Sequence, residues 1–115
     1  TWLLAANRVE RFGFIEPFTK DNKRWREVYA PLWRERLQIW LSFWRDVLVT
    51  ATGARVAIFN LDQEQFIRNL AEQLGVSHAQ KILSAHERTI NLLALYCNPR
   101  LTLEVLMLEL PFTRS

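Results

Sequence analysis

The chain has 115 residues, a length that suits one domain with a single hydrophobic core. Half of the residues are hydrophobic and only three are glycine, which favours packed helices and argues against disorder or a turn-rich β-sandwich. The formal net charge of +3 is uneven, because residues 1–55 carry ten Lys and Arg against six acids and residues 56–115 carry five against six, an excess that permits nucleic-acid binding without indicating it.

The first 20 residues predict helices that are short and interrupted. Apolar side chains over residues 2–20 follow a helical stripe, but Gly13 and Pro17 fall inside it. Proline in a helix interior removes a hydrogen bond and clashes with the preceding turn, at a cost of about 3 kcal/mol. We therefore expect two short helical pieces, with a break or kink near Glu16.

A stronger helical pattern follows. Asp21 or Asn22 can cap the next segment, which meets Pro31 before it continues. From Trp33 onward large apolar residues recur at helical spacing: Trp33, Leu37, Trp40, Leu41, Trp44 and Leu48. This helix should end at Gly53, since glycine readily adopts the left-handed conformation of a helix C-terminus.

The middle of the chain contains a connector and two candidate helix starts. Residues 55–61, RVAIFNL, are rich in β-forming residues, but no partner strand exists elsewhere. A buried connector or a short helical turn is the better prediction. Asp62 with Gln65, and Ser77 with Gln80, have the spacing of capping boxes at helix starts.

Two helices and a tight junction are predicted toward the C-terminus. The first helix should stop at Gly75, and the second, a long one, should end near Cys97, on its apolar face. Asn98 then acts as an N-cap, with Pro99 at the first helical position, because proline lacks only an amide hydrogen that no helix could pair there. The last helix should run to about Leu110.

This last helix is apolar on nearly every side, whereas an ordinary surface helix has one apolar stripe. On a helical wheel its apolar residues form two sets on different sides. The set that we expect the bundle to bury is Leu101, Val105 and Leu108. The set that we expect to meet a neighbouring subunit is Leu103, Met107 and Leu110, with Phe112 extending the patch.

The whole pattern predicts an all-α fold, a single bundle of five to six helices. No Gly-rich phosphate loop, no Ser or Cys nucleophile signature and no metal-ligand spacing occurs in the sequence, so we expect no catalytic, cofactor or metal site. His78, beside Ser77, should be solvated. His86 lies on an apolar face and is more typical of a core histidine than of a ligand.

Two features leave a nucleic-acid function open. The tryptophans would suit a platform for stacking single-stranded bases, although Trp33, Trp40 and Trp44 share their stripe with leucines and are better explained as core. The basic residues Lys20, Lys23, Arg24 and Arg26 are interrupted by Asp21 and are typical of a solvated face.

The single cysteine cannot form an internal disulfide, and we expect an intracellular, cytoplasmic chain. No apolar run reaches the roughly 18 residues needed to span a bilayer, and nothing resembles a signal peptide, so no membrane partner is expected. Thr1 opens onto the apolar run WLLAA without an initiator methionine, from which we expect a piece of a longer protein.

Four stretches resemble one known family. They are RFGFIEPFTKD at 11–21, LSFWRDVL at 41–48, NLDQEQ at 60–65 and NPRLTLEVLMLELP at 98–111. Together they are similar to the C-terminal domain of the bacterial DNA polymerase III delta prime subunit. The family's last helix opens with Asn-x-Arg-Leu and contains a Leu-Glu pair, matched here by Asn98, Arg100, Leu101, Leu103 and Glu104. Pro17 departs from the family pattern, in which the equivalent stretch is continuously helical.

The resemblance implies a collar domain, a non-catalytic helical bundle that packs against the gamma/tau and delta subunits and holds the clamp-loader pentamer together. ATP binding and sliding-clamp contact belong to the AAA+ part of such proteins, and DNA is met only through the assembled complex. Two alternatives stay open: a gamma/tau collar domain, and a helical DNA-binding module that uses the basic N-terminal half and exposed tryptophans. An enzyme is a distant third.

Overall fold

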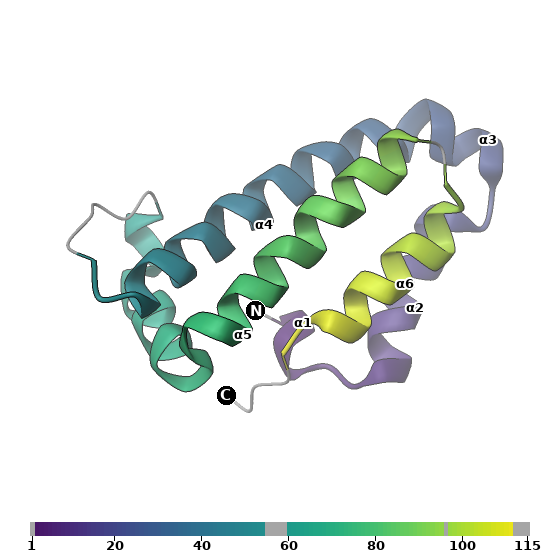
Figure 1. Cartoon of the computed structure of the whole chain (residues 1–115). Helices are drawn as coiled ribbons and strands as arrows, with labels where there is room; N and C mark the ends of the chain where they lie inside the picture. The colour runs from purple at the N-terminus through teal and green to yellow at the C-terminus, as the bar shows by residue number, and fades with distance from the viewer. Residues whose placement is uncertain (1, 55–59, 96, 112–115) are drawn as a thin grey trace. The chain divides into compact units, whose positions relative to one another are not determined.

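A computed structural model of the chain describes residues 2–54, 60–95 and 97–111 (Figure 1). Its elements in chain order are α1 (Trp2–Ala5), α2 (Arg8–Thr19), α3 (Asn22–Arg24), the π-helix η1 (Trp25–Tyr29), α4 (Ala30–Ala51), the 3-10 helix η2 (Leu61–Gln63), α5 (Glu64–Ala94) and α6 (Pro99–Glu109). Every regular element in these described ranges is helical, so the predicted all-α class is confirmed.

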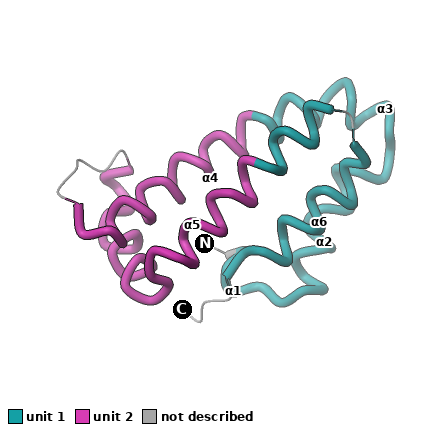
Figure 2. The backbone as a smooth tube through the Cα atoms, viewed as in Figure 1, with its two compact units in different colours: residues 1–34, 88–115 teal, residues 35–87 magenta. Residues whose placement is uncertain are grey.

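The backbone divides into two compact units (Figure 2). Unit 1 comprises residues 1–34 and 88–115, and unit 2 comprises residues 35–87. Unit 1 therefore holds α1, α2, α3, η1 and α6 together with one end each of α4 and α5, and within it α2 packs against α6. Unit 2 holds the rest of α4 and α5 with η2 between them.

Helix α2 continues through Pro17, so the predicted break near Glu16 is wrong. The chain breaks earlier, at Asn7, whose side chain accepts a hydrogen bond from the Glu10 amide at 2.9 Å while the Glu10 carboxylate accepts one from the Asn7 amide at 3.0 Å. Pro17 lies near the end of the helix, and the residue four positions before it is the exposed Gly13. The carbonyl that loses its amide partner therefore remains open to solvent.

The helix start that was predicted at Asp21 is present. The π-helix that follows accommodates Pro31, because its turn is wider than that of an α-helix. The Asp21 side chain accepts hydrogen bonds from two backbone amides, at 3.0 and 3.2 Å. The π-helix that follows ends just before Pro31, and the Ala30 amide donates to the Trp25 carbonyl. Because proline crowds the carbonyl four residues earlier, a turn with the longer π-type spacing relieves that contact.

Glycine marks both of the predicted helix ends. Gly53 has φ 78°, and α4 ends at Ala51, just before it. Gly75, with φ 76° and ψ 174°, interrupts α5 between residues 64–74 and 76–94. Both are left-handed or extended conformations that only glycine adopts without strain, which confirms these two boundaries.

Of the local predictions in the middle of the chain, one is untested and two are wrong. Residues 55–59, most of the predicted connector, lie outside the described residues. Asp62 lies within η2 and does not precede it. The side-chain amide of Gln65 donates to the Asn69 side chain at 3.0 Å, so the capping box predicted for Asp62 and Gln65 is wrong. Helix α5 ends at Ala94, and Cys97 lies beyond it rather than on its apolar face.

The cores of both units are rich in aromatic side chains. In unit 1 the rings of Phe14, Phe18, Tyr29 and Trp33 meet edge to face, with centroids 5.1 to 5.9 Å apart. In unit 2 Phe43 meets Trp44 in the same way at 5.2 Å. Trp33 and Trp44 are less than 10% exposed, so the prediction that the tryptophan stripe is core is confirmed for these two residues, whereas Trp40 of the same stripe is half-buried. Trp25, outside the stripe, is also buried.

Candidate functional site

Helix α6 presents one buried and one exposed row of apolar side chains. The buried row is Leu103, Leu106, Met107 and Leu110. The exposed row is Leu101 at 61%, Val105 at 43% and Leu108 at 51% of full exposure. The sequence-based assignment of the inward side is therefore reversed, because the set expected in the core is outside and Leu103, Met107 and Leu110 are inside. Phe112 lies outside the described residues.

The reversal has a simple physical reason. Two apolar stripes on opposite sides of one helix have the same period, so periodicity cannot say which stripe faces the core. Leu106 was the available signal, since on a helical wheel it lies beside Leu110, at the edge of the stripe of Leu103, Met107 and Leu110, and makes that side the wider one. The prediction that α6 contacts another subunit stays a prediction, and burial moves it from Leu103, Met107 and Leu110 to the exposed row.

Arg11 holds the buried side of α6 in place. Its side chain is 6% exposed, and its three nitrogens donate to five backbone carbonyls at 2.7 to 3.3 Å. These carbonyls belong to two segments, the end of α1 and the end of α6: Leu3, Leu4, Met107, Leu110 and Pro111. Burial lowers the pKa of Arg11 below its ordinary value, but an arginine remains charged.

The clasp formed by Arg11 satisfies carbonyls that a helix end leaves unpaired, and the positive charge matches the negative end of the helix dipole. Sequence reasoning missed this residue. The available signal was a single arginine among Phe12, Phe14 and Ile15, on a segment with no acid three or four residues away on its apolar side.

Asp46 plays a comparable part in unit 2. Its carboxylate is 4% exposed and accepts two hydrogen bonds from Asn60, from the backbone amide at 2.9 Å and from the side-chain amide at 2.6 Å. The same side-chain amide lies 3.5 Å from the Ser42 hydroxyl. Asp46 thereby ties α4 to the start of η2. No role was predicted for this residue from the sequence.

His86 is fully buried beside two tryptophans. Its ring centroid lies 6.1 Å from that of Trp40 and 6.2 Å from that of Trp44. Nδ1 lies 2.9 Å from the Ile82 carbonyl and therefore carries the proton, whereas Nε2 meets no hydrogen-bond partner among the described residues. Burial lowers the pKa of His86, and the hydrogen bond to Ile82 opposes that effect in part. The prediction of a core histidine is confirmed.

The junction before α6 has a local cap. Asn98 accepts a hydrogen bond from the Leu101 amide at 3.0 Å, and Pro99 occupies the start of the helix. The Thr102 hydroxyl donates to the Asn98 carbonyl at 2.7 Å. These contacts fix the start of α6 by local chemistry alone.

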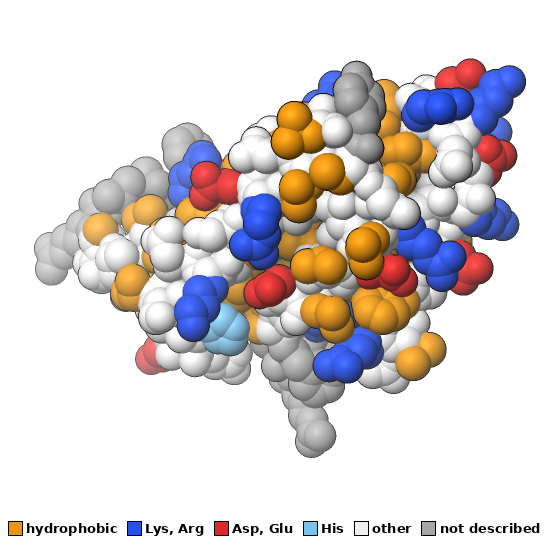
Figure 3. All heavy atoms as spheres, turned by 45° about the vertical axis from the view of Figure 1, so that its right-hand side comes forward, with side chains coloured by type: hydrophobic (Ala, Val, Ile, Leu, Met, Phe, Trp, Pro, Cys, Tyr) orange, Lys and Arg blue, Asp and Glu red, His pale blue; other side chains and the backbone are white. Residues whose placement is uncertain are grey.

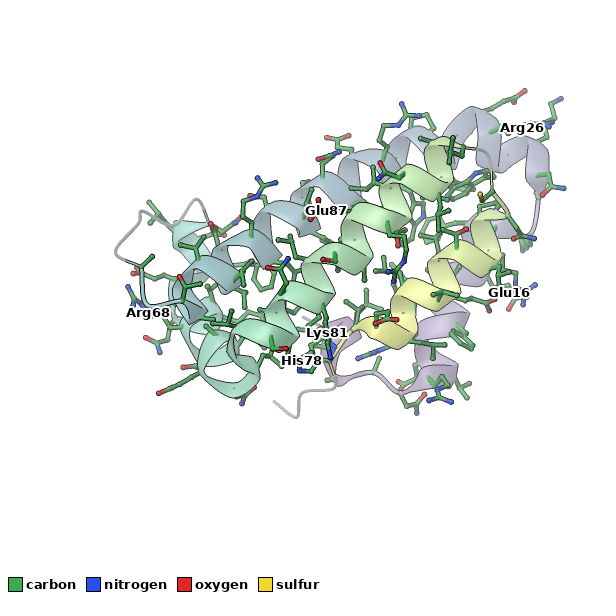
Figure 4. All side chains as sticks on the ribbon, viewed as in Figure 1. Glu16, Arg26, Arg68, His78, Lys81 and Glu87 are labelled. Carbon is green, nitrogen blue, oxygen red and sulfur yellow. The ribbon has the colours of Figure 1, made fainter. Side chains whose placement is uncertain are left out.

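The described residues offer little for catalysis. Within them no group of three or more His, Cys, Asp or Glu could hold a metal ion. His78 is exposed on α5, and Figure 4 shows it near Lys81. Among the described residues, no helix is long and apolar enough to cross a bilayer.

The four stretches that carried the family resemblance meet in two pairs. In unit 1, Arg11 of the first stretch binds carbonyls of the last stretch. In unit 2, Asp46 of the second stretch binds Asn60 of the third. Residues of these motifs therefore make contacts that hold helices together, and the fold is a helical domain.

A family model described as DNA polymerase III, delta subunit, C terminal, matches residues 15–111. The chain therefore belongs to this family of DNA polymerase III clamp-loader subunit domains. No curated protein and no solved structure matches the chain. The matched description names delta, where the sequence motifs resemble delta prime, and the clamp-loader class is common to both.

Proposed function

We propose that this chain is the C-terminal collar domain of a delta prime-type subunit, a non-catalytic module that holds the clamp-loader pentamer together for DNA replication. Its partners are then other clamp-loader subunits, gamma/tau and delta, and DNA is met through the assembled complex. Family membership supports the replication role. The contacts of the motif residues support a packing role, because they join helices.

The exposed row on α6 is the observation that carries this proposal. Leu101, Val105 and Leu108 stand four and three residues apart, which is the spacing of a seam between two helices. Helix α6 already buries its other side, so this row adds nothing to the core of unit 1. Figure 3 shows a face on which hydrophobic side chains are exposed among charged ones. Such patches mark interaction surfaces.

Two ion pairs at α6 partly neutralise charged side chains beside the exposed row, which would otherwise disfavour binding of an apolar partner. Arg100 lies 3.8 Å from Glu104, and Arg88 lies 3.9 Å from Glu109. Pairing of neighbouring charges leaves an apolar row with a polar rim, which is the common composition of a subunit interface. A partner helix of the same kind, apolar along one stripe, fits this row best.

The test is Val105→Asp in the full subunit, mixed with the other clamp-loader subunits. We expect at least tenfold weaker assembly by analytical ultracentrifugation, because a charge is placed in the seam. Val9→Asp is the matched control, since Val9 is 80% exposed on α2 and belongs to the same unit. Equal assembly by parent and Val105→Asp, with both folded, would remove the α6 interface.

The choice of subunit needs a separate experiment. A delta prime-type chain should complete a mixture that contains delta and gamma/tau but lacks delta prime. Completion of a mixture that lacks delta would assign the chain to delta, as the family description reads. Completion only of a mixture that lacks gamma/tau would support the gamma/tau alternative.

The alternative DNA-binding module has fewer tryptophans available for stacking than it needs to be favoured. Trp25, Trp33 and Trp44 are buried and cannot stack on bases. A salt-dependent affinity for DNA together with no affinity for clamp-loader subunits would favour this alternative.

A further inference from the structure

The turn between α2 and η1 concentrates positive charge. Residues 20–26 contain four Lys and Arg and one Asp, a net charge of +3 that equals the formal charge of the entire chain. All four basic side chains are exposed: Lys20, Lys23, Arg24 and Arg26. Figure 4 shows the Arg26 side chain extending away from the helices, and Figure 3 shows several Lys and Arg side chains, with Asp and Glu among them, near the right-hand edge of the face in view.

The ion pairs of unit 1 do not involve these four residues. Glu104 and Glu109 pair with Arg100 and Arg88. Among the described residues no carboxylate lies within ion-pair distance of the four basic residues of this turn. The Asp21 carboxylate lies within the turn, and one of its oxygens accepts hydrogen bonds from two backbone amides.

The position of these cations is unfavourable for folding. Residues 22–51 are helical without interruption, and positive side chains near the start of a helix face the positive end of its dipole. Acids are preferred there, yet Lys23, Arg24 and Arg26 occupy the first turns and Glu27 is the only acid in them. The Asp21 cap and the Arg24 contact with Tyr29 offset this cost only in part, since Lys23 and Arg26 have no ion pair among the described residues. A local departure from such a rule is typical of a binding surface.

One of the four cations is held in a fixed position. Arg24 Nε lies 3.4 Å from the Tyr29 hydroxyl, and its guanidinium carbon lies 5.7 Å from the centre of the Tyr29 ring. Tyr29 in turn packs edge to face on Phe18, at 5.1 Å. This arrangement uses one nitrogen of the guanidinium, and arginine presents its remaining donors as a planar fork that suits phosphate.

We propose that Lys20, Lys23, Arg24 and Arg26 form a contact for the phosphate backbone of duplex DNA. The contact goes beyond the proposed function, which needs no DNA bound by this chain. It is independent of base sequence, because contacts to phosphate oxygens carry no sequence information and the aromatic ring of Trp25 is buried. A polyphosphate backbone complements a cluster of unpaired cations, and the family to which the chain belongs serves DNA polymerase III.

The test compares two triple variants of equal charge. The patch variant is Lys20→Gln, Lys23→Gln and Arg26→Gln, which leaves the Arg24 contact with Tyr29 intact. The control is Arg8→Gln, Arg45→Gln and Lys81→Gln, three exposed cations outside the turn. Both lower the net charge by three, so a difference between them reports position and not total charge. Equal melting temperatures establish that both are folded.

Affinity for a fluorescent 30-base-pair duplex is measured by anisotropy between 50 and 200 mM salt. We expect the patch variant to bind at least tenfold more weakly than the parent chain at 50 mM, with a salt slope smaller by about 2 to 3, since each lost phosphate contact removes about 0.9 from the slope. The control should bind within threefold of the parent.

Three results would overturn the proposal: no binding of duplex by the parent chain at 50 mM salt, equal loss in both triple variants, or tighter binding of polyglutamate than of duplex. The last result would assign the turn to an acidic protein. None of these measurements uses other clamp-loader subunits, so their failure leaves the α6 interface untouched, and failure of that interface leaves this contact untouched.

Discussion

Arg11 is a buried cation that is held by backbone carbonyls instead of a carboxylate. We expect Arg11→Met to lower the free energy of unfolding by at least about 2 kcal/mol, because it leaves carbonyls at the ends of α1 and α6 without partners. Arg11→Lys should also destabilise, since an ammonium group cannot reach five carbonyls from one position. Urea denaturation measures both variants.

Arg8→Met is the control for Arg11, because Arg8 lies in the same helix with an exposed side chain. It should change stability by no more than about 0.5 kcal/mol. A chain in which Arg11→Met is as stable as Arg8→Met would show that the carbonyls find other partners and that the clasp is unimportant.

His86 gives the stability of the chain a pH dependence of known sign. Its folded pKa is lowered by burial, so below the ordinary value of about 6.5 the unfolded chain takes up a proton that the folded chain does not. Stability from this residue is therefore present above pH 6.5 and falls as the pH drops toward the folded pKa. The loss between pH 7.5 and 5.5 is at most about 1.4 kcal/mol.

His86→Phe should reduce that pH dependence, because phenylalanine keeps an aromatic ring beside Trp40 and Trp44 and cannot titrate. Urea denaturation at the two pH values measures the difference. If the variant loses as much stability on acidification as the parent chain, a group other than His86 is responsible for the pH dependence.

Residues that act through their own backbone neighbours were predictable from the sequence, and residues that act across the fold were not. Asp21 and Asn98 cap helices through amides two or three residues away, so their spacing is sufficient. Arg11 and Asp46 bind groups 7 to 100 residues away. Only the tertiary arrangement brings those groups together.

At the scale of a helix, the Asn98 side chain caps the start of α6. Asn98→Ala should lower the free energy of unfolding by about 0.5–2 kcal/mol, because the Leu101 amide loses its acceptor. Asn98→Asp should restore most of that loss, since aspartate is an equally good cap. A thermal melt that moves equally for both variants would mean that the Asn98 side chain acts in some other way.

The existence of the helices followed from periodicity and glycine, but their orientation did not. Gly53 and Gly75 end helical segments where the sequence indicated. Helix α6 was predicted with the correct span and the wrong inward side, since both stripes are apolar. The prediction of a break near Glu16 was wrong for a related reason. The cost of Pro17 depends on whether the carbonyl that it leaves unpaired is buried, and that carbonyl belongs to Gly13, an exposed residue.

At the scale of the whole molecule, the two compact units share two helices. The division falls after Arg34 within α4 and after Glu87 within α5. If one unit unfolded alone, each helix would end at that point, and the new end would leave four backbone amides or carbonyls without partners. We therefore expect the chain to unfold in one cooperative transition, as a single domain does.

Two core substitutions test this expectation, Met107→Ala in unit 1 and Ile67→Ala in unit 2, both at fully buried positions. Each should cost about 2–5 kcal/mol and shift the entire transition, so that tryptophan fluorescence and far-ultraviolet circular dichroism give the same midpoint. Fluorescence reports on both units, because Trp33 lies in unit 1 and Trp44 in unit 2. If Met107→Ala instead split the curve and left a second step at the parent midpoint, the units would unfold independently, and α4 and α5 would be helices that can each be divided at low cost.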